Sequence, residues 1–218
     1  LWHQVYFYGT AFEKVYPSSN TPGACFLAGT TQSYYNAAIA SVDSMGAMIW
    51  NQQVGGLVCT VKGLVELSDG SIILSRRVTG LTGPSINCYL EKYDSNGNLM
   101  LSNPMEQYAH DNLTIILDTT EGLVTDGPDS YVFYFTRITY NDEKRLVFVR
   151  VNGNMESLCT KTYSRQIKTF NKTATGKYSA IFYSFDSFDL TNALDICGQD
   201  PCDDLSTPAF YPENRSSG

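Results

Sequence analysis

The stretch DSNGN, which begins at Asp94, has the oxygen-bearing side chains from which calcium sites are built. A calcium loop between two helices needs oxygen ligands at positions 1, 3 and 5, glycine at 6 and an acidic residue at 12. Asp94, Asn96 and Asn98 meet the first requirement, but Gly97 falls at position 4 and Met105 at position 12. Asn-Gly between apolar runs favours a hairpin instead, because a tight turn needs positive φ. The sequence predicts a hairpin, with no metal and no cofactor.

Two acidic segments could supply carboxylates for the hydrolysis of a glycosidic bond. They are SFDSFDLTNALD and GQDPCDD, which contain Asp186, Asp189, Asp195, Asp200, Asp203 and Asp204. Glycoside hydrolysis needs two carboxyl groups held across a cleft. Nothing in the spacing fixes such a pair, so solvated turn residues are favoured, with a weak surface calcium site at 198–204 as the alternative.

Nucleophilic catalysis has little support. The sequence contains no Gly-x-Ser-x-Gly elbow. His3 lies beside an expected end strand and His110 in a polar turn, so no Ser-His-Asp or Cys-His set is indicated. Tyr34 and Tyr35 form a pair in a loop, where aromatic rings can stack on sugars or anchor a protein interface. We take them as an interaction-site hypothesis, beside the alternative that they pack over a strand.

The composition excludes two classes of partner. The chain of 218 residues has a net charge of −7, and an acidic surface repels phosphate backbones, so we expect no nucleic-acid partner. No apolar run approaches the ~20 residues of a membrane span. Low charge with fifteen Tyr and eleven Phe favours β-structure. The first residues show neither an initiator Met nor a signal-peptide pattern, which indicates a mature or excised product.

The cysteine pattern favours an oxidising, extracellular setting. Cys197 and Cys202 bracket the turn-forming GQDP, which predicts a local disulfide. The remaining four cysteines allow three connectivities, which the sequence does not decide. These four are Cys25, Cys59, Cys88 and Cys159. An even count is typical of secreted chains; the alternative is a reduced protein with buried, inert thiols.

Three N-glycosylation sequons begin at Asn112, Asn171 and Asn214. Their number is close to what chance gives for this composition. They are therefore consistent with a secreted glycoprotein without demonstrating one.

A repeat of about 50 residues runs along the chain. Segments 23–54, 70–105 and 129–163 each contain an apolar strand, a polar linker, a second strand, a tight turn and a third strand. The turns are marked by Gly46, Gly97 and Gly153. We expect a fourth strand to complete each unit, in LVCTVKGLVELSDG, DNLTIILDTTEG and RQIKTFNKTATG. Four short strands per repeat is typical of a propeller blade.

The two ends of the chain contain partial units. LWHQVYFYG and AFEKVYPSSNTPG match strands three and four, whereas 176–185 and 190–197 match strands one and two. The sequence thus predicts an all-β, propeller-like fold of about four four-stranded blades, with terminal half-blades that can pair. We expect one such domain at 1–196 and an irregular extension at 197–218.

FLAGTTQS, EKYDSNGNLML and LWHQVYFYG resemble the β-propeller repeat of secreted and surface proteins. The resemblance covers about residues 1–185, and the third unit keeps only VRVNGN, with a turn that reads two residues shorter. It implies an extracellular or surface-attached propeller, and it implies no single activity because propellers host many.

The predicted function follows from the extension and from the absence of catalytic motifs. Residues 197–218 fit no blade, and Phe210 and Tyr211 could dock on a neighbouring edge strand. We therefore expect a secreted or cell-surface, non-enzymatic structural or interaction glycoprotein. Its partners would be copies of itself, as in an extracellular assembly or filament, or other extracellular proteins. The alternatives are a glycan-binding, lectin-like propeller and a propeller hydrolase with two converging carboxylates.

Overall fold

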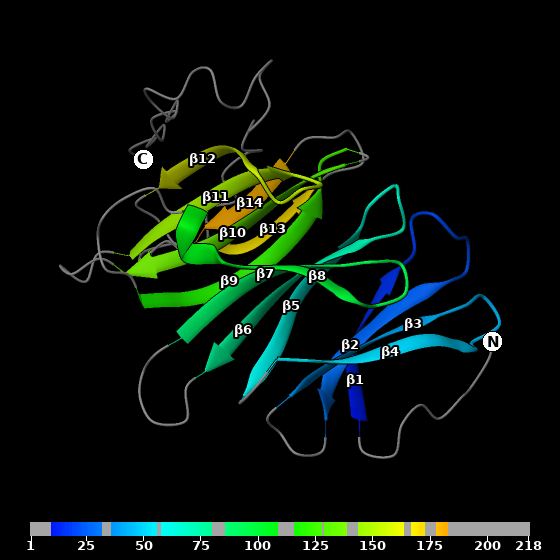
Figure 1. Cartoon of the computed structure of the whole chain (residues 1–218). Helices are drawn as coiled ribbons and strands as arrows, with labels where there is room; N and C mark the ends of the chain where they lie inside the picture. Colours follow the sequence, from blue (N-terminus) through cyan, green and yellow to red (C-terminus); the bar gives the residue numbers. More distant parts are fainter. Residues whose placement is uncertain are drawn as a thin grey trace, which may run out of the picture.

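The computed structural model describes residues 10–31, 36–55, 58–79, 86–108, 116–127, 129–138, 144–163, 167–172 and 178–182. The elements in these ranges are β-strands, apart from one short 3-10 helix, η1 (Met105–Tyr108). The strands form antiparallel sheets that follow one another in chain order, from the blue sheet to the orange hairpin in Figure 1. The prediction of an all-β, propeller-like fold is confirmed.

Each sheet is a meander in which consecutive strands are hydrogen-bonded neighbours. The first contains β1 (Thr10–Pro17), β2 (Cys25–Thr31), β3 (Ala37–Val42) and β4 (Met48–Val54). The second contains β5 (Cys59–Glu66), β6 (Ile72–Thr79), β7 (Ile86–Tyr93) and β8 (Leu99–Pro104). The third contains β9 (Ile116–Thr125), β10 (Ser130–Ile138), β11 (Lys144–Asn152) and β12 (Ser157–Tyr163). β13 (Ile167–Lys172) pairs with β14 (Tyr178–Phe182).

The blades begin one strand earlier than the sequence predicts. The strand of AFEKVYP, expected to close a unit, opens the first sheet, where Val15 pairs with Leu27. Likewise β5 and β9 open the second and third sheets instead of completing the preceding ones. A repeat read from sequence is cyclic, so it does not reveal where a unit starts. The predicted closure joins residues 1–22 to 176–185 and 190–197. Of these, β1 pairs with β2 and β14 pairs with β13, whereas 1–9 and 183–197 lie outside the described residues.

Apolar side chains fill the spaces between neighbouring sheets. One buried cluster joins Ile39 and Val54 of the first sheet to Leu74 of the second. Another joins Leu90 of the second sheet to Phe133 of the third. Because a fully buried side chain of this kind stabilises the fold by ~1.5–3 kcal/mol, face-to-face packing of sheets is the main source of stability.

The hairpin predicted at Asp94 is confirmed. Asp94 Oδ1 accepts hydrogen bonds from the backbone N–H of Asn96 at 2.9 Å and of Asn98 at 2.8 Å. Gly97 has a φ of 82°. Hydrogen bonds from Asn98, first from its side chain and then from its backbone, hold the pKa of the Asp94 carboxyl below its usual value. The carboxylate thus serves the turn itself.

The turn of the third unit is not shortened, so that prediction is wrong. Asn152 Oδ1 accepts hydrogen bonds from the N–H groups of Asn154 and Glu156, the same pattern as in the second unit. The left-handed position is occupied by Met155, with a φ of 65°, and not by Gly153. Met155 is only 2% exposed. Burial of its side chain offsets the ~1–2 kcal/mol that a non-glycine residue loses in this conformation.

The predicted disulfides among the four other cysteines are absent, because all four described cysteines are thiols. They lie on β2, β5, β7 and β12, no two of which are paired strands. A disulfide requires Cα atoms within about 7 Å, a distance that strands paired side by side provide most readily. Cys197 and Cys202 lie outside the described residues.

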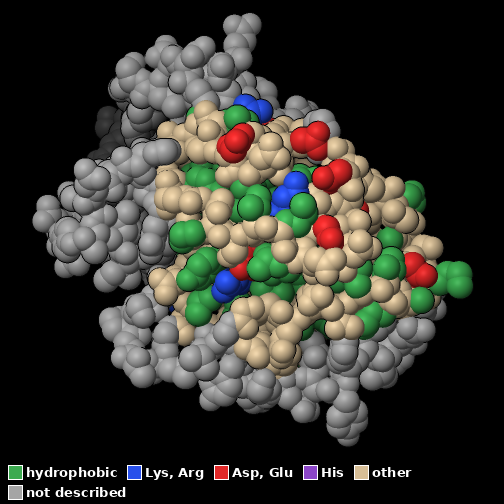
Figure 2. Space-filling view, in the orientation of Figure 1, with side chains coloured by type: hydrophobic (Ala, Val, Ile, Leu, Met, Phe, Trp, Pro, Cys, Tyr) green, Lys and Arg blue, Asp and Glu red, His purple; other side chains and the backbone are tan. Residues whose placement is uncertain are grey.

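The visible surface is mixed in character. On the face that Figure 2 shows, acidic and basic side chains are scattered among apolar and neutral ones, and one basic side chain lies beside an acidic one. No helix in the described ranges has the length and apolar character needed to cross a membrane.

Candidate functional site

The first strands of the sheets meet at the inner edges of the blades. β1, β5 and β9 each lie at one end of their sheet. β5 contacts β9, and β9 contacts β13, so contacts between neighbouring sheets pass through these strands. Side chains on the first strands are therefore the ones that the fold gathers from several blades.

Each first strand carries a β-bulge, which lies near the centre of β1, β5 and β9 and near the start of β13. In β1, Phe12 pairs with Gly29 and Lys14 with Ala28, which leaves Glu13 as the extra residue. Bulges redirect side chains and are frequent beside active sites.

The other three first strands repeat this irregularity. Lys62 is the extra residue of β5, and Lys168 is the extra residue of β13. In β9, Glu121 and Gly122 together face the single residue Tyr134. We call the four charged residues at these positions the bulge row: Glu13, Lys62, Glu121 and Lys168.

The bulges of the first three sheets lie at one level. Lys14 Nζ donates hydrogen bonds to the carbonyl oxygens of Val61 and Lys62, at 3.2 Å and 3.1 Å. A Cβ atom added to Gly63 would lie 2.8 Å from Cβ of Leu123. The β1 bulge therefore contacts the β5 bulge through Lys14, and Gly63 beside the β5 bulge contacts Leu123 beside the β9 bulge. The backbone at the first three bulges thus lies at one level.

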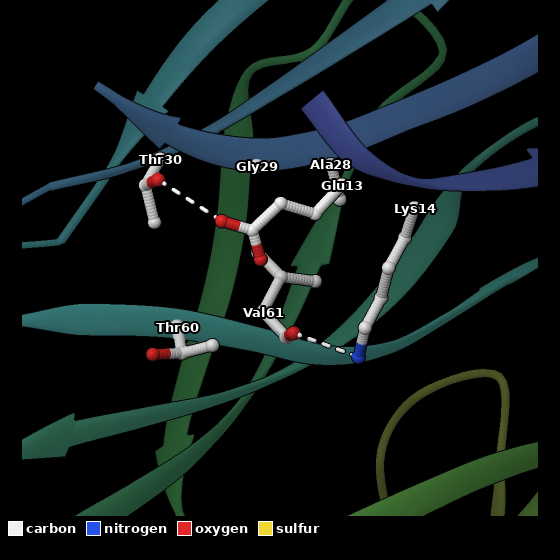
Figure 3. Close-up of a pocket in the computed structure, with 7 residues that line it drawn as sticks. All are labelled: Glu13, Lys14, Ala28, Gly29, Thr30, Thr60 and Val61. Carbon is white, nitrogen blue, oxygen red and sulfur yellow. Dashed lines mark hydrogen bonds between the residues drawn. The ribbon is translucent and has the colours of Figure 1, made fainter. Parts of the chain in front are cut away.

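A small cavity adjoins Glu13, between β1, β2 and β5 (Figure 3). Its volume is about 10 Å³, close to the minimum that holds one water molecule. Thr30 Oγ1 donates a hydrogen bond to Glu13 Oε1 at 3.2 Å. The second carboxylate oxygen of Glu13 accepts no hydrogen bond from the part of the chain that the structure describes. The Glu13 carboxylate is thus oriented by a neighbour and open to a ligand.

A second polar cluster lies inside the second sheet. Arg76 donates to Glu91 at 2.7 Å, with side chains 11% and 3% exposed. Glu91 also accepts hydrogen bonds from the hydroxyl groups of Tyr93 and Ser102. The Arg76 guanidinium lies over the Tyr89 ring, 4.2 Å from its centroid. The ion pair itself is buried, whereas Ser102 is exposed and Tyr89 half-buried. The charges of Arg76 and Glu91 satisfy each other, although Nε of Arg76 is buried without a hydrogen-bond partner among the described residues.

The same cluster affects two weak acids. Burial raises the pKa of the Tyr93 hydroxyl, and the charge of Glu91 raises it further. Burial also raises the pKa of the Cys59 thiol, although the Arg76 charge opposes this shift. Both groups therefore stay protonated at neutral pH, and Cys59 has no features of a nucleophile.

The structure describes few of the site residues that the sequence suggests. Asn171 lies in β13, where it pairs with Ser179. The other suggested residues lie outside the described ranges: Tyr34, Tyr35, Asn112, Cys197, Cys202, Phe210, Tyr211 and Asn214. Among the described residues, no group of three or more His, Cys, Asp or Glu is placed to hold a metal ion.

Sequence reasoning missed the bulge row, although a signal was present. KGLV begins at Lys62 and EGLV begins at Glu121, so the same three apolar or small residues follow a charged residue in two successive units. A charged residue that recurs at the same position of an otherwise apolar strand, in successive units, is the pattern that could have indicated the bulges.

No protein-family model matches the sequence, and no curated protein sequence matches it either. Among solved structures, the chain is similar to the crystal structure of endo-arabinase from Bacteroides thetaiotaomicron VPI-5482. The TM-score is 0.48 and the identity is 10%, over 79% of this chain and 69% of that chain.

This finding contradicts the predicted function. The sequence favours a non-enzymatic structural or interaction glycoprotein, whereas the similar solved structure is that of an enzyme. We therefore withdraw the non-enzymatic prediction. At 10% identity the similarity does not assign that enzyme's activity to this chain.

Proposed function

We propose that the chain is a glycan-directed hydrolase whose catalytic carboxylates are Glu13 of β1 and Glu121 of β9. The observation that carries this proposal is their equivalent position, each at the central bulge of an inner strand. Only β5 separates these two strands in the order of the blades. Cleavage of a glycosidic bond needs two carboxyl groups, one on each side of the bond.

The surroundings of Glu13 suit the role of acid or base. Thr30 orients one carboxylate oxygen, and the adjacent cavity has room for about one water molecule. If Glu13 and Glu121 stand about 5–5.5 Å apart, one acts as a nucleophile and configuration is retained. If they stand about 6.5–9.5 Å apart, a water molecule attacks and configuration is inverted. The anomeric configuration of the sugar first released from a substrate distinguishes the retaining from the inverting mechanism.

An extracellular location fits a polymeric glycan substrate, and we include it in the proposal. Its support is the resemblance of FLAGTTQS and EKYDSNGNLML to repeats of secreted and surface propellers. The sequons at Asn112, Asn171 and Asn214 are the positions where glycosylation would be found.

The test is release of reducing sugar from a panel of neutral and acidic polysaccharides. Glu13→Gln and Glu121→Gln should each lower kcat by ~10²–10⁴-fold, the usual contribution of an acid–base group, without lowering Tm. Asp118 is the matched control, because it is also an unpaired bulge residue of β9 but at a different register position. Asp118→Asn should keep its activity.

Two results would overturn the proposal. One is full activity in Glu13→Gln or Glu121→Gln. The other is release of no sugar by the intact chain from any polysaccharide of the panel.

A further inference from the structure

We infer that the outer strands of the blades form a docking surface for another protein whose contact surface is both basic and apolar. The docking surface, here called the outer band, comprises the tight turn before the last strand of each four-stranded sheet and the first residues of that strand. Its three segments are residues 43–49, 94–100 and 152–158. The last strands lie at the opposite end of each sheet from the bulge row, so the outer band is independent of the proposed catalytic site.

The last strand of each four-stranded sheet carries a bulge with an exposed apolar residue. Ile49 is the extra residue of β4, Met100 of β8 and Leu158 of β12. Their side chains are 61%, 57% and 48% exposed. Each follows by six positions the residue whose side chain caps the turn, namely Asp43, Asp94 and Asn152. Because bulges redirect side chains, the fold presents an apolar side chain at one equivalent position of three successive blades.

The outer band concentrates the exposed apolar surface of the described residues. Seven large apolar side chains of these residues are exposed, and five of them lie in the band. The five are Met45, Ile49, Leu99, Met100 and Leu158. Hydrogen bonds between blades connect the three segments, because Trp50 donates to the Ser95 carbonyl oxygen and Lys92 of β7 donates to that of Gly153. Single exposed apolar residues need no explanation, but such a group marks an interaction site.

Charge indicates which partner can cover the outer band. The three segments contain Asp43, Asp94 and Glu156 and no Lys or Arg. None of these carboxylates forms an ion pair with the described part of the chain.

Like charge opposes the two other candidates for this surface. A second copy of the chain carries a net charge of −7, and residues 183–218 contain seven acidic side chains and one basic one. Both are therefore repelled at neutral pH. A basic protein is attracted instead, because complementary charge steers association, and its apolar side chains cover those of the band.

The probe is a peptide of alternating Lys and Leu, titrated against the full chain at neutral pH by fluorescence anisotropy. A peptide of alternating Lys and Ser keeps the charge alone, and one of alternating Glu and Leu keeps the apolar side chains alone. We expect the Lys-Leu peptide to bind about tenfold more tightly than either. Ile49→Ser with Met100→Ser should weaken its binding about tenfold, as the loss of a hot spot does.

Two further variants separate apolar contact from charge. Val15→Ser is the matched control, because Val15 is 63% exposed but lies on the inner strand β1, and it should leave binding unchanged. Asp43→Asn with Asp94→Asn should weaken binding and reduce its dependence on salt. Asparagine can hold these turns, since Asn152 accepts the same two hydrogen bonds in the third sheet.

Three results would overturn the inference. Equal binding of the Lys-Ser peptide would reduce the interaction to general attraction by an acidic chain. An equal loss of binding in Val15→Ser would remove the outer band as the point of contact. A dimer at neutral pH that Met100→Ser dissociates would make a second copy, and not a basic protein, the occupant of the band.

Discussion

Trp50 connects the first two sheets through a single turn. Its Nε1 donates a hydrogen bond to the carbonyl oxygen of Ser95 at 2.8 Å. A Cβ atom added to Gly97 would lie 2.7 Å from Trp50 Cε3. With its φ of 82°, Gly97 is thus required both for the turn and for the contact with the indole ring.

Replacement of Gly97 by Ala should therefore lower the free energy of unfolding by ~2–4 kcal/mol, through backbone strain and steric overlap together. Gly70→Ala is the control, because Gly70 also has positive φ but its added Cβ meets only Ser95 at 3.5 Å. It should lose only ~1–2 kcal/mol. Urea denaturation measures both losses. If Trp50→Ala does not reduce the cost of Gly97→Ala, the steric explanation fails.

The Asp94 carboxylate predicts a pH dependence of stability. Its folded pKa lies below its usual value, first because of the Asn98 side chain. A lowered folded pKa gives stability that is complete above the unfolded pKa of ~3.9. That stability is lost as pH falls through the folded pKa. Wild type should exceed Asp94→Asn in Tm at pH 7, and the difference should shrink below pH 4. A difference independent of pH would assign the effect to hydrogen-bond geometry alone.

The hairpin at Asp94 was predictable from the sequence, whereas the equivalent turn at Met155 was not. Asn-Gly is a local signal, so adjacent residues are enough to predict it. Met155 takes the left-handed conformation because its side chain is buried between sheets. The burial that stabilises this conformation of Met155 depends on residues far away in sequence, so no local sequence pattern predicts it.

Among the elements, the strands were predictable and their assignment to sheets was not. Alternating apolar runs identify a strand, but β5 follows β4 at the same short spacing whether it joins the first sheet or opens the second. Hydrogen bonding decides: β5 pairs with β6. The bulge row was missed for the same reason, because a bulge exists only relative to the partner strand.

A polar row crosses β6, β7 and β8, from the buried Arg76 and Glu91 to the exposed Ser102. Removing one partner of a buried ion pair leaves an uncompensated charge, which costs ~3–5 kcal/mol. Arg76→Met and Glu91→Leu should each be destabilised by about this amount. The double variant should lose less than the sum of the two, as a double-mutant cycle of urea denaturation would show. Additive losses would mean that the pair does not act as a unit.

At the scale of the whole molecule, neighbouring blades are locked by polar contacts as well as by their cores. Glu66 at the end of β5 accepts hydrogen bonds from Ser18, Ser19 and Asn20 in the loop after β1. Ser68, in the turn after β5, donates a hydrogen bond to Asp129, in the turn after β9. The first and second blades, and the second and third, therefore contact each other through their first turns, and these contacts keep β1, β5 and β9 aligned.

The outer edge of the second blade is apolar and exposed. Leu99, Met100 and Leu101 of β8 are 54%, 57% and 44% exposed, and β8 ends its sheet. An apolar, uncharged edge strand is a template for pairing with another chain. Charge repulsion opposes this at neutral pH, but the net charge approaches zero near the pI of 4.7.

We therefore expect light scattering to show association of the chain near pH 4.7 and little association at pH 7.5. Met100→Lys should suppress the association near pH 4.7. The control is Met45→Lys, which adds the same charge at a side chain 77% exposed in a turn rather than at a strand edge. If Met45→Lys suppresses association equally, net charge governs it. If only Met100→Lys does so, unpaired backbone groups of β8 are the point of contact.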